Sequence, residues 1–275
     1  MTTPTPPTSA LKSLVRRAIG RTGYMLVKYR TPQGGFGSAA DAASGPIVYA
    51  PDLEPEFRDL HARCAPFTMT PVERMYNLDL AMRAVLDAGV PGDIVECGVW
   101  RGGSAMLCAL RLARAGDAHR RIWLYDTFTG MAPPTDQDVS STGATTREIW
   151  EASQRAGHNE WCYAPLDDVK RNMASTGLSP DRFEFVQGRV EDTLPIRTPE
   201  RIALLRLDTD WYESTRAELT HLYPRLSPGG VLIVDDYGQW MGQRRAVDEF
   251  LASLPAGRRP LLARIDRSCR MGVKP

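Results

Sequence analysis

Several features that mark familiar protein classes are missing from this sequence. No Cys-x-x-Cys pair occurs among its five scattered cysteines, so neither a zinc knuckle nor a disulfide framework is predicted. No apolar run approaches the roughly 20 residues that span a bilayer, and a formal net charge of +1 creates no general attraction to nucleic acid or membrane. With 275 residues and a hydrophobic share of 43%, the chain is predicted to be a globular, cytoplasmic protein.

Two nucleotide-binding motifs are also absent from the most glycine-rich turn, Glu96 to Ser104 (ECGVWRGGS). It is not a Gly-x-Gly-x-x-Gly fingerprint, and it lacks the Lys-Ser/Thr ending of a Walker loop. Gly98, Gly102 and Gly103 still allow the backbone to turn sharply and approach a ligand closely. Since Glu96 would repel a pyrophosphate, the stretch predicts either a simple tight turn or a site for a ligand with a cationic or neutral polar tail.

The first quarter of the chain differs from the rest. Basic residues without acids run from Lys12 to Arg30, which indicates a solvated arm or a lid that binds a partner, and a Gly/Ala/Ser-rich linker follows at 32–46. We expect two parts: an N-terminal arm, linker and lid region at 1–66, and one large domain at 67–275.

Strand and helix patterns alternate through that domain. Thr70 is predicted to be an N-cap, with Pro71 at the first helical position and Glu73 completing a capping box. Helices are expected at 72–86, 103–115, 212–226 and 243–254, and strands at 93–98, 121–126, 182–188, 201–208 and 231–236. Two short strand-like runs end the chain, and a partly helical insert occupies 127–177. This order predicts an α/β fold with a doubly wound, mostly parallel sheet.

In such sheets ligands bind beyond the carboxyl ends of the strands, so the residues that follow each strand carry the functional argument. Asp126 ends the second strand, where it would accept hydrogen bonds from a ribose diol or merely cap the next turn. Gly188, Arg189 and Val190 follow the third strand and would line an adenine ring. Trp161 and its neighbours in the insert would either face an acceptor or pack the insert onto the sheet.

Carboxylates follow the last two parallel strands, at Asp208-Thr209-Asp210 and at Asp235-Asp236. Adjacent acids at the edge of a core raise each other's pKa values and cost stability when they are unpaired. A hard divalent cation relieves this repulsion, and carboxylates with water are the ligands that Mg²⁺ prefers. The pattern therefore predicts a magnesium site at this rim.

Four stretches carry a family resemblance: DIVECGVWRGGSAM, LYDTFTGM, LRLDTDWYEST and GGVLIVDDYGQW. From Phe67 to the C-terminus the chain closely resembles the macrocin-type O-methyltransferases. These enzymes have a class I methyltransferase fold (Rossmann-like) and use S-adenosylmethionine to methylate sugar hydroxyls of macrolides and aminocoumarins. The resemblance implies an antibiotic-biosynthesis enzyme that acts on a small glycosylated substrate and forms a homodimer.

The resemblance also implies roles for individual positions. Mg²⁺ would be held by Asp208, Asp235 and Asp236, and the base that deprotonates the acceptor hydroxyl would be Asp208, with Asp210 as a competitor. S-adenosylmethionine would contact residues from four segments: Met69, Thr70, Glu96, Gly98, Trp100, Gly102, Ser104, Asp126, Thr127, Phe128, Gly188, Arg189 and Val190.

Three alternatives remain open at this point. A catechol-type O-methyltransferase would use the same donor and similar acids on an aromatic diol. A glycosyltransferase would use Asp208-Thr209-Asp210 as an Asp-x-Asp motif for a nucleotide-sugar, although it leaves Asp126 without a role. A non-catalytic scaffold is disfavoured because none of the acids is missing.

Overall fold

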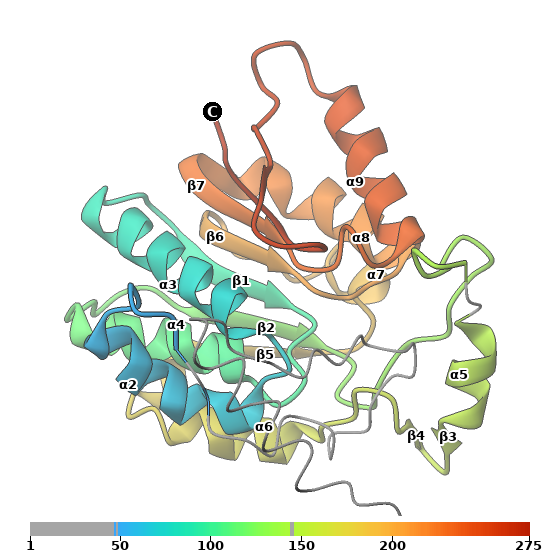
Figure 1. Cartoon of the computed structure of the whole chain (residues 1–275), viewed down its shortest axis with the longest axis horizontal. Helices are drawn as coiled ribbons and strands as arrows, with labels where there is room; N and C mark the ends of the chain where they lie inside the picture. Colours follow the sequence, from blue (N-terminus) through green and yellow to red (C-terminus); the bar gives the residue numbers. More distant parts are fainter. Residues whose placement is uncertain (1–46, 48, 144–145) are drawn as a thin grey trace, which may run out of the picture. The chain divides into compact units, whose positions relative to one another are not determined.

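The computed structural model of this protein describes residues 47, 49–143 and 146–275. The predicted basic arm and linker lie outside the described residues. In the rest, strands and helices alternate as predicted (Figure 1). The helices are α2 (Pro55–Cys64), α3 (Val72–Asp87), α4 (Gly103–Arg114), α5 (Arg147–Ala152), α6 (Leu166–Ala174), α7 (Val190–Thr193), α8 (Tyr212–His221) and α9 (Met241–Ser253), with short 3-10 turns at Ala65–Phe67, Pro180–Arg182 and Tyr223–Arg225.

Seven strands form one sheet in the order β5-β2-β1-β6-β7-β9-β8. They are β1 (Asp93–Cys97), β2 (Ile122–Asp126), β5 (Phe183–Gln187), β6 (Ile202–Leu207), β7 (Leu226–Val234), β8 (Ala263–Arg264) and β9 (Arg270–Val273). The first five in spatial order pair in parallel, whereas β9 is antiparallel to both β7 and β8. The prediction of a doubly wound, mostly parallel sheet is confirmed. Because β1 has β2 on one side and β6 on the other, the switch point lies at its end.

The sheet is buried on both faces, which explains why its central strands read as continuous apolar runs. All six residues of β6 are buried. Leu204 belongs to the core that packs against α2, α3 and α4, whereas its neighbour Leu205 belongs to the core under α8 and α9. Figure 1 shows these two groups of helices on opposite faces of the sheet.

Helix α2 packs into the same core as the sheet. Phe57 and Leu60 are fully buried there, together with residues of α3 and α4. The boundary that the sequence suggested between residues 66 and 67 therefore falls inside one packed core. The insert between β2 and β5 is partly helical as predicted, with α5, α6 and a small hairpin of β3 (Gln154–Arg155) and β4 (His158–Asn159).

The structure corrects three local predictions. Helix α3 has Pro71 rather than Thr70 at its N-cap, with no side-chain capping bond, because the Thr70 hydroxyl accepts a hydrogen bond from Arg206 instead. Helix α8 ends at His221 and a 3-10 turn replaces its expected last turn. Strand β7 begins five residues earlier than predicted, at Leu226, and ends at Val234, so Asp235 and Asp236 lie just beyond it.

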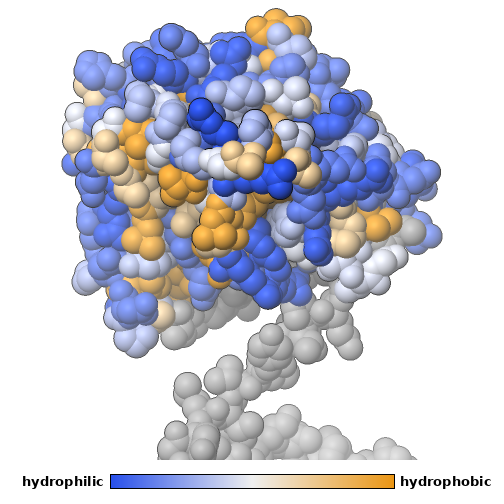
Figure 2. Space-filling view, turned by 90° about the horizontal axis from the view of Figure 1, so that it is seen from above, coloured by the Kyte–Doolittle hydropathy of each residue, from blue (hydrophilic) through white to orange (hydrophobic). Residues whose placement is uncertain are grey.

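The surface is largely polar. In the view of Figure 2, hydrophobic residues form a band bordered by hydrophilic ones. The most exposed large hydrophobic side chains include Ile196 and Leu261, each 87% exposed. Within the described part of the chain, every helix is too short or too polar to cross a membrane.

Candidate active site

The ends of the parallel strands meet at one rim of the sheet, as predicted. Main-chain pairing continues one residue past the strands: Asp208 N donates to Cys97 O at 2.8 Å, and Asp235 N donates to Leu207 O at 3.0 Å. These bonds fix the first residue after β6 and the first residue after β7 relative to their neighbours. The acids of the two strand ends are therefore positioned by the sheet ladder itself.

The loop after β1 requires glycine at two positions. Gly98 has φ +83°, and a Cβ on it would lie 2.1 Å from the carbonyl oxygen of Asp208. Gly102, the N-cap of α4, has φ +90°. Both conformations are favourable for glycine and strained for other residues. Trp100, between them, adopts φ +47°, so the loop carries strain at the place where a donor is expected.

Asp126 holds this loop through its carboxylate. Its Oδ2 accepts from the main-chain nitrogens of Val99 at 2.7 Å and Trp100 at 3.1 Å, and its Oδ1 accepts from Phe128 N at 2.7 Å. Burial raises the pKa of Asp126, and these hydrogen bonds oppose the shift. These contacts agree with the interpretation that Asp126 caps the turn after β2. They also show that Asp126 holds the loop after β1. Binding of a ribose by Asp126 stays a prediction.

The other predicted donor residues after β2 shape the same rim. Thr127 Oγ1 donates to Gly130 O at 2.6 Å, which closes the turn. Phe128 has φ +53° and is buried, with its ring centroid 6.4 Å from that of Phe185. The two residues therefore stabilise the local backbone and give the rim an apolar wall.

The three residues after β5 differ in exposure. Gly188 has φ +136° and its nitrogen donates to Asp126 O at 3.0 Å, which ties β5 to β2. Arg189 is the N-cap residue of α7 and its guanidinium is paired with Glu191 at 2.8 Å, whereas Val190 is buried. Contact of Arg189 and Val190 with an adenine ring stays a prediction.

The segment before α3 reaches the rim from the other side. Met69 is 51% exposed, whereas the Thr70 hydroxyl accepts from Arg206 Nη2 at 3.0 Å. Ser104, at the start of α4, is buried and hydrogen-bonds Glu96. Thr70, Ser104 and Glu96 thus belong to one polar network, while Met69 remains free to contact a ligand.

Three carboxylates come together at the rim. Oxygen atoms of Asp208, Asp210 and Asp236 all lie within 4.8 Å of one another, a spacing that suits a metal ion. The predicted set contained Asp235 in place of Asp210, and the structure does not bring Asp235 into this group. Asp235 is buried, and its Oδ1 has no hydrogen-bond partner among the described residues.

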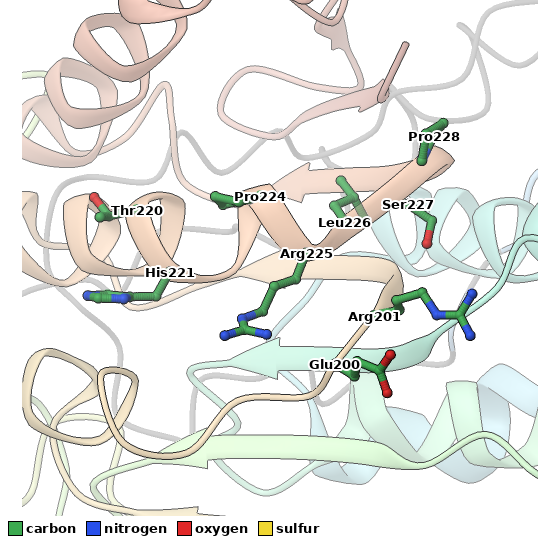
Figure 3. Close-up of a pocket in the computed structure, with 9 residues that line it drawn as sticks. All are labelled: Glu200, Arg201, Thr220, His221, Pro224, Arg225, Leu226, Ser227 and Pro228. Atoms are coloured by element: carbon green, nitrogen blue, oxygen red, sulfur yellow. The ribbon is translucent and has the colours of Figure 1, made fainter.

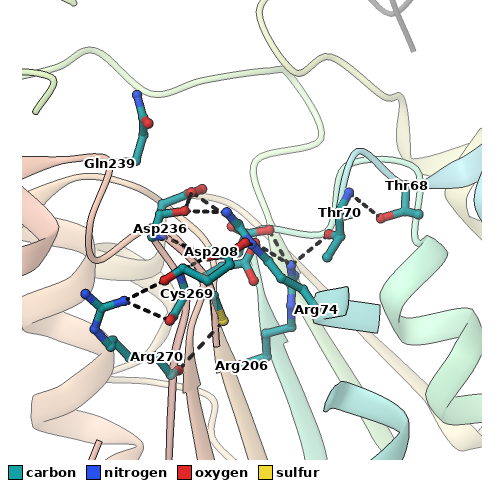
Figure 4. Close-up of polar contacts among 12 residues, drawn as sticks. Thr68, Thr70, Arg74, Arg206, Asp208, Asp236, Gln239, Cys269 and Arg270 are labelled. Atoms are coloured by element: carbon teal, nitrogen blue, oxygen red, sulfur yellow. Dashed lines mark hydrogen bonds and ion pairs between the residues drawn. The ribbon is translucent and has the colours of Figure 1, made fainter. Parts of the chain in front are cut away.

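Sequence reasoning missed the buried arginine that neutralises these acids. Arg206, on β6, places Nη1 2.5 Å from Glu96 Oε1 and 2.9 Å from Asp208 Oδ2, and Nη2 3.0 Å from Asp235 Oδ2 (Figure 4). A lone charged residue inside the apolar run of β6 was the available signal, because a buried charge is almost always paired.

A second arginine contacts the acids from α3. Arg74 Nη1 lies 2.9 Å from Asp235 Oδ2 and 3.3 Å from Asp236 Oδ1, and its Nε lies 2.7 Å from Asp266 Oδ2. Asp208, Asp235 and Asp236 thus each have an arginine partner. The inference that these acids would be unpaired without a cation was wrong, since the protein supplies two permanent positive charges.

The remaining electrostatics favour proton transfer at neutral pH. Burial raises the pKa values of Asp208 and Asp210 well above the ordinary range, and neighbouring acids add to the effect. The pKa of Asp236 is also raised by burial and by Asp235, while that of Glu96 is raised to about 7 by burial. Carboxyl groups with raised pKa values are suited to accept a proton from a reacting group.

Tryptophans join the insert to this rim. Trp161 of the insert packs edge-on against Trp211 and Trp240, at centroid distances of 5.7 and 6.1 Å. Trp211 Nε1 also donates to Ala132 O at 2.8 Å. The interpretation that Trp161 packs the insert onto the sheet is confirmed. Burial and, after it, the negative charge of acids such as Asp210 and Asp208 raise the pKa of the adjacent Cys162 thiol.

An open hollow of about 480 Å³ lies away from these residues (Figure 3). It lies beside the amino ends of β6 and β7, whereas the acids follow the carboxyl ends of these strands. Its lining residues are Glu200, Arg201, Thr220, His221, Pro224, Arg225, Leu226, Ser227 and Pro228. Neither the acid group nor the loop after β1 contributes to it, so it is separate from the candidate active site.

The strand order, the turn after β1 and the acids after β6 and β7 define a class I S-adenosylmethionine-dependent methyltransferase fold. Residues 55–270 match the family described as Macrocin-O-methyltransferase (TylF), and the chain belongs to this family of O-methyltransferases. The match covers β1 to β8 and all the carboxylates of the rim. It disfavours the glycosyltransferase alternative.

Curated relatives point the same way. The chain is 39% identical over 199 residues to the 8-demethyl-8-(2,3-dimethoxy-alpha-L-rhamnosyl)-tetracenomycin-C 4'-O-methyltransferase of Streptomyces olivaceus, covering 72% of this chain and 73% of that protein. It is 36% identical to the demethyldecarbamoylnovobiocin O-methyltransferase of Streptomyces niveus, covering 74% of each. The solved structure of the O-methyltransferase NovP superimposes with a TM-score of 0.65 at 34% identity, covering 76% of this chain and 82% of that chain.

Proposed function

We propose that this protein transfers the methyl group of S-adenosylmethionine to a hydroxyl of a sugar on a glycosylated natural product. The observation that carries the proposal is the carboxylate group Asp208, Asp210 and Asp236, beside the strained turn after β1. The relatives add the acceptor class: one acts on a rhamnosyl-tetracenomycin, and another, from Micromonospora griseorubida, is a mycinamicin III 3''-O-methyltransferase, 40% identical over 62% of this chain and 65% of that protein.

The donor would lie against the turn after β1. S-adenosylmethionine supplies an electrophilic methyl group on a positively charged sulfur. The nearby acids Asp208, Asp210 and Asp236 favour a positive charge at this place, whereas Glu96 is paired with Arg206. The rigid turn between Gly98 and Gly102 would fix the donor relative to Asp208, because the Gly98 backbone contacts Asp208 directly.

The residues present fit a divalent cation. Asp208 and Asp236 belong both to the predicted set and to the group within 4.8 Å, and all the available donors are carboxylate oxygens. Asp210 Oδ1 is buried without a hydrogen-bond partner among the described residues, so it offers an oxygen to a cation. Mg²⁺ held there would lower the pKa of a bound acceptor hydroxyl.

Asp210 is the stronger candidate for the base. Asp208 Oδ2 is 2.9 Å from Arg206 Nη1, and this pairing favours the ionised form and weakens Asp208 as a proton acceptor. Asp210 has no arginine partner among the described residues, and burial raises its pKa well above the ordinary range. A positioned base contributes about 10²–10⁴-fold to such reactions.

A methyl-transfer assay tests the proposal. Labelled S-adenosylmethionine is incubated with a panel of glycosylated macrolides and aminocoumarins, with Mg²⁺, with EDTA, and with Mg²⁺ restored. We expect transfer to sugar hydroxyls that EDTA abolishes and Mg²⁺ recovers. Asp208→Asn and Asp210→Asn should lose turnover and keep S-adenosylhomocysteine binding, whereas Asp248→Asn, an exposed acid on α9, should match the wild type. Full turnover in EDTA would reject the metal, and transfer only to aromatic diols would reject the acceptor.

Thermal-shift titrations separate the remaining alternative. S-adenosylhomocysteine should raise the midpoint of unfolding and UDP should not; the reverse result would favour a nucleotide-sugar enzyme.

The homodimer and the cytoplasmic location also stay predictions. Light scattering of the purified protein checks the homodimer.

A further inference from the structure

The turn that follows β6 is strained at Asp210. Trp211 N donates to Thr209 O at 2.9 Å, which closes a three-residue γ-turn with Asp210 at its centre. Asp210 adopts φ +73°, the rare and strained form of this turn. Such a conformation persists only where the surroundings hold it, and strained residues of this kind concentrate at functional sites. Something must therefore hold the turn that presents Asp208 and Asp210.

Thr209 supplies the attachment. Its hydroxyl donates to Glu218 Oε1 at 2.7 Å and lies 2.8 Å from Ser214 Oγ, and both partners belong to α8. Thr209 therefore anchors the turn to α8, while the acids on either side of it, Asp208 and Asp210, share the carboxylate group of the rim. Helix α8 begins at Tyr212, directly after the turn, so it can act as a rigid support.

Glu218 is an unexpected residue in this position. It is completely buried, and no arginine, lysine or histidine pairs with it in the part of the chain that the structure describes. Its contacts are the Thr209 hydroxyl and the Cys97 thiol. Burial raises its pKa to about 8, so the group is largely uncharged at neutral pH. A buried carboxyl without a cation is unfavourable for folding, which suggests a role other than stability.

We propose that Glu218 is a positioning residue that, through the Thr209 hydroxyl, holds the strained turn presenting Asp208 and Asp210. The proposal rests on the methyltransferase function argued above, since it concerns the acids assigned there. Without this anchor the γ-turn would relax and Asp210 would move away from Asp208 and Asp236. Displacement of a reacting group by about 1 Å can lower a rate by about 10²-fold.

A matched pair of valine variants tests the proposal. Thr209→Val removes the anchoring hydroxyl with little change in shape. Thr215→Val makes the same exchange on α8, at a fully buried hydroxyl that has no hydrogen-bond partner among the described residues. We expect Thr209→Val to lower kcat by about 10- to 100-fold, with S-adenosylhomocysteine affinity unchanged within about twofold. Thr215→Val should retain wild-type kcat.

Hydrogen exchange of the amides from Asp208 to Ser214 gives a readout that does not depend on activity. The Trp211 amide should exchange faster in Thr209→Val than in Thr215→Val, because its acceptor belongs to the loosened turn. Glu218→Gln, which keeps an acceptor oxygen, should preserve kcat and exchange, whereas Glu218→Leu should reproduce the Thr209→Val defect. Should Thr209→Val fail to fold, Thr209→Ala and Thr209→Ser carry the same comparison, with loss expected only in the alanine variant.

The two readouts separate this proposal from the function on which it rests. Equal exchange rates and equal kcat in the two valine variants would overturn the anchoring role. If the wild type transferred no methyl group to any acceptor, the proposed function would fail, and the exchange comparison would still decide whether Glu218 and Thr209 hold the turn.

Discussion

Arg206 Nη1 lies 2.5 Å from Glu96 Oε1, and both side chains are almost completely buried. This pair joins the strand before the proposed donor turn to the strand before the proposed acid group. The same guanidinium also contacts Asp208 and Asp235. The Arg206 guanidinium therefore connects the strand before the donor turn with the acid group, and its loss should disturb both parts of the site.

Replacing Arg206 with methionine should strongly destabilise the protein. The change leaves Glu96, Asp208 and Asp235 without their shared partner in a buried setting. Breaking a buried ion pair in this way costs about 3–5 kcal/mol. Urea unfolding monitored by circular dichroism measures the change.

The surface pair of Arg245 and Glu249 provides the control. Its Nε–Oε1 distance is 2.7 Å, but both side chains are about half exposed. Arg245→Met should cost less than about 1 kcal/mol, since solvent screens such pairs. Similar losses for Arg206→Met and Arg245→Met would contradict the importance given to the buried network.

Arg74→Met should tighten the binding of a divalent cation. Arg74 lies 3.3 Å from Asp236 and 2.9 Å from Asp235, so its positive charge opposes a second cation at these acids. Removing a unit charge a few ångströms away should increase the affinity for Mg²⁺ or Mn²⁺ by at least about tenfold, the factor that Coulomb's law gives at the dielectric constant of water. Isothermal titration calorimetry on the folded variant gives the dissociation constant.

Arg83→Met is the comparison for this prediction. Arg83 belongs to the same helix, α3, and pairs with Glu54 and Asp79 rather than with the acids of the rim. Its loss should leave cation affinity unchanged. Weaker cation binding in Arg74→Met would show that Arg74 orients the ligands more than it repels the ion.

Gly98→Ala should impair both stability and activity. The added Cβ would lie 2.1 Å from the Asp208 carbonyl oxygen, so β1 and β6 would have to separate at the rim. Gly116→Ala is matched in conformation, with φ +64°, but its Cβ would meet nothing within 4 Å. We expect Gly98→Ala to lose about 2 kcal/mol more than Gly116→Ala in urea unfolding and to lose most of its kcat. Equal effects would mean that the contact with Asp208 is easily relieved.

Glu218 should make stability fall as pH rises. Burial raises its pKa to about 8 from an ordinary value of 4.5, so between these values the folded protein binds more protons than the unfolded chain. Its contribution is complete below the unfolded pKa and is lost as pH rises through the folded pKa. Glu218→Gln does not titrate and should therefore gain on the wild type by about 1–3 kcal/mol between about pH 5.5 and pH 8.5.

Urea unfolding at the two pH values measures this difference, with Glu249→Gln on α9 as the exposed control. The control should shift equally at both pH values. A constant difference between Glu218→Gln and the wild type would show that Glu218 is ionised in the folded protein throughout.

Much of the fold was predictable from local patterns. Apolar runs such as β6 and the second half of β7 (231–234) indicate strands buried on both faces, and the helices between them fix a parallel order. Because parallel strands end at the same edge, the sequence also predicted that the acids after β6 and β7 would meet; Asp208 and Asp236 do, but Asp210 takes the place predicted for Asp235. The predicted cap at Thr70 failed because its hydroxyl binds Arg206, a partner 136 residues away.

The sequence by itself determined the order of strands and helices and the edge at which the acids gather, since both follow from hydrophobic periodicity and chain direction. Only the tertiary structure decided how the acids are tolerated. Arg74 pairs with Asp235 across 161 residues of sequence, and Glu218 on α8 accepts a hydrogen bond from the Thr209 hydroxyl. Such pairings depend on the direction of individual side chains in the packed core, and periodicity carries no information about it.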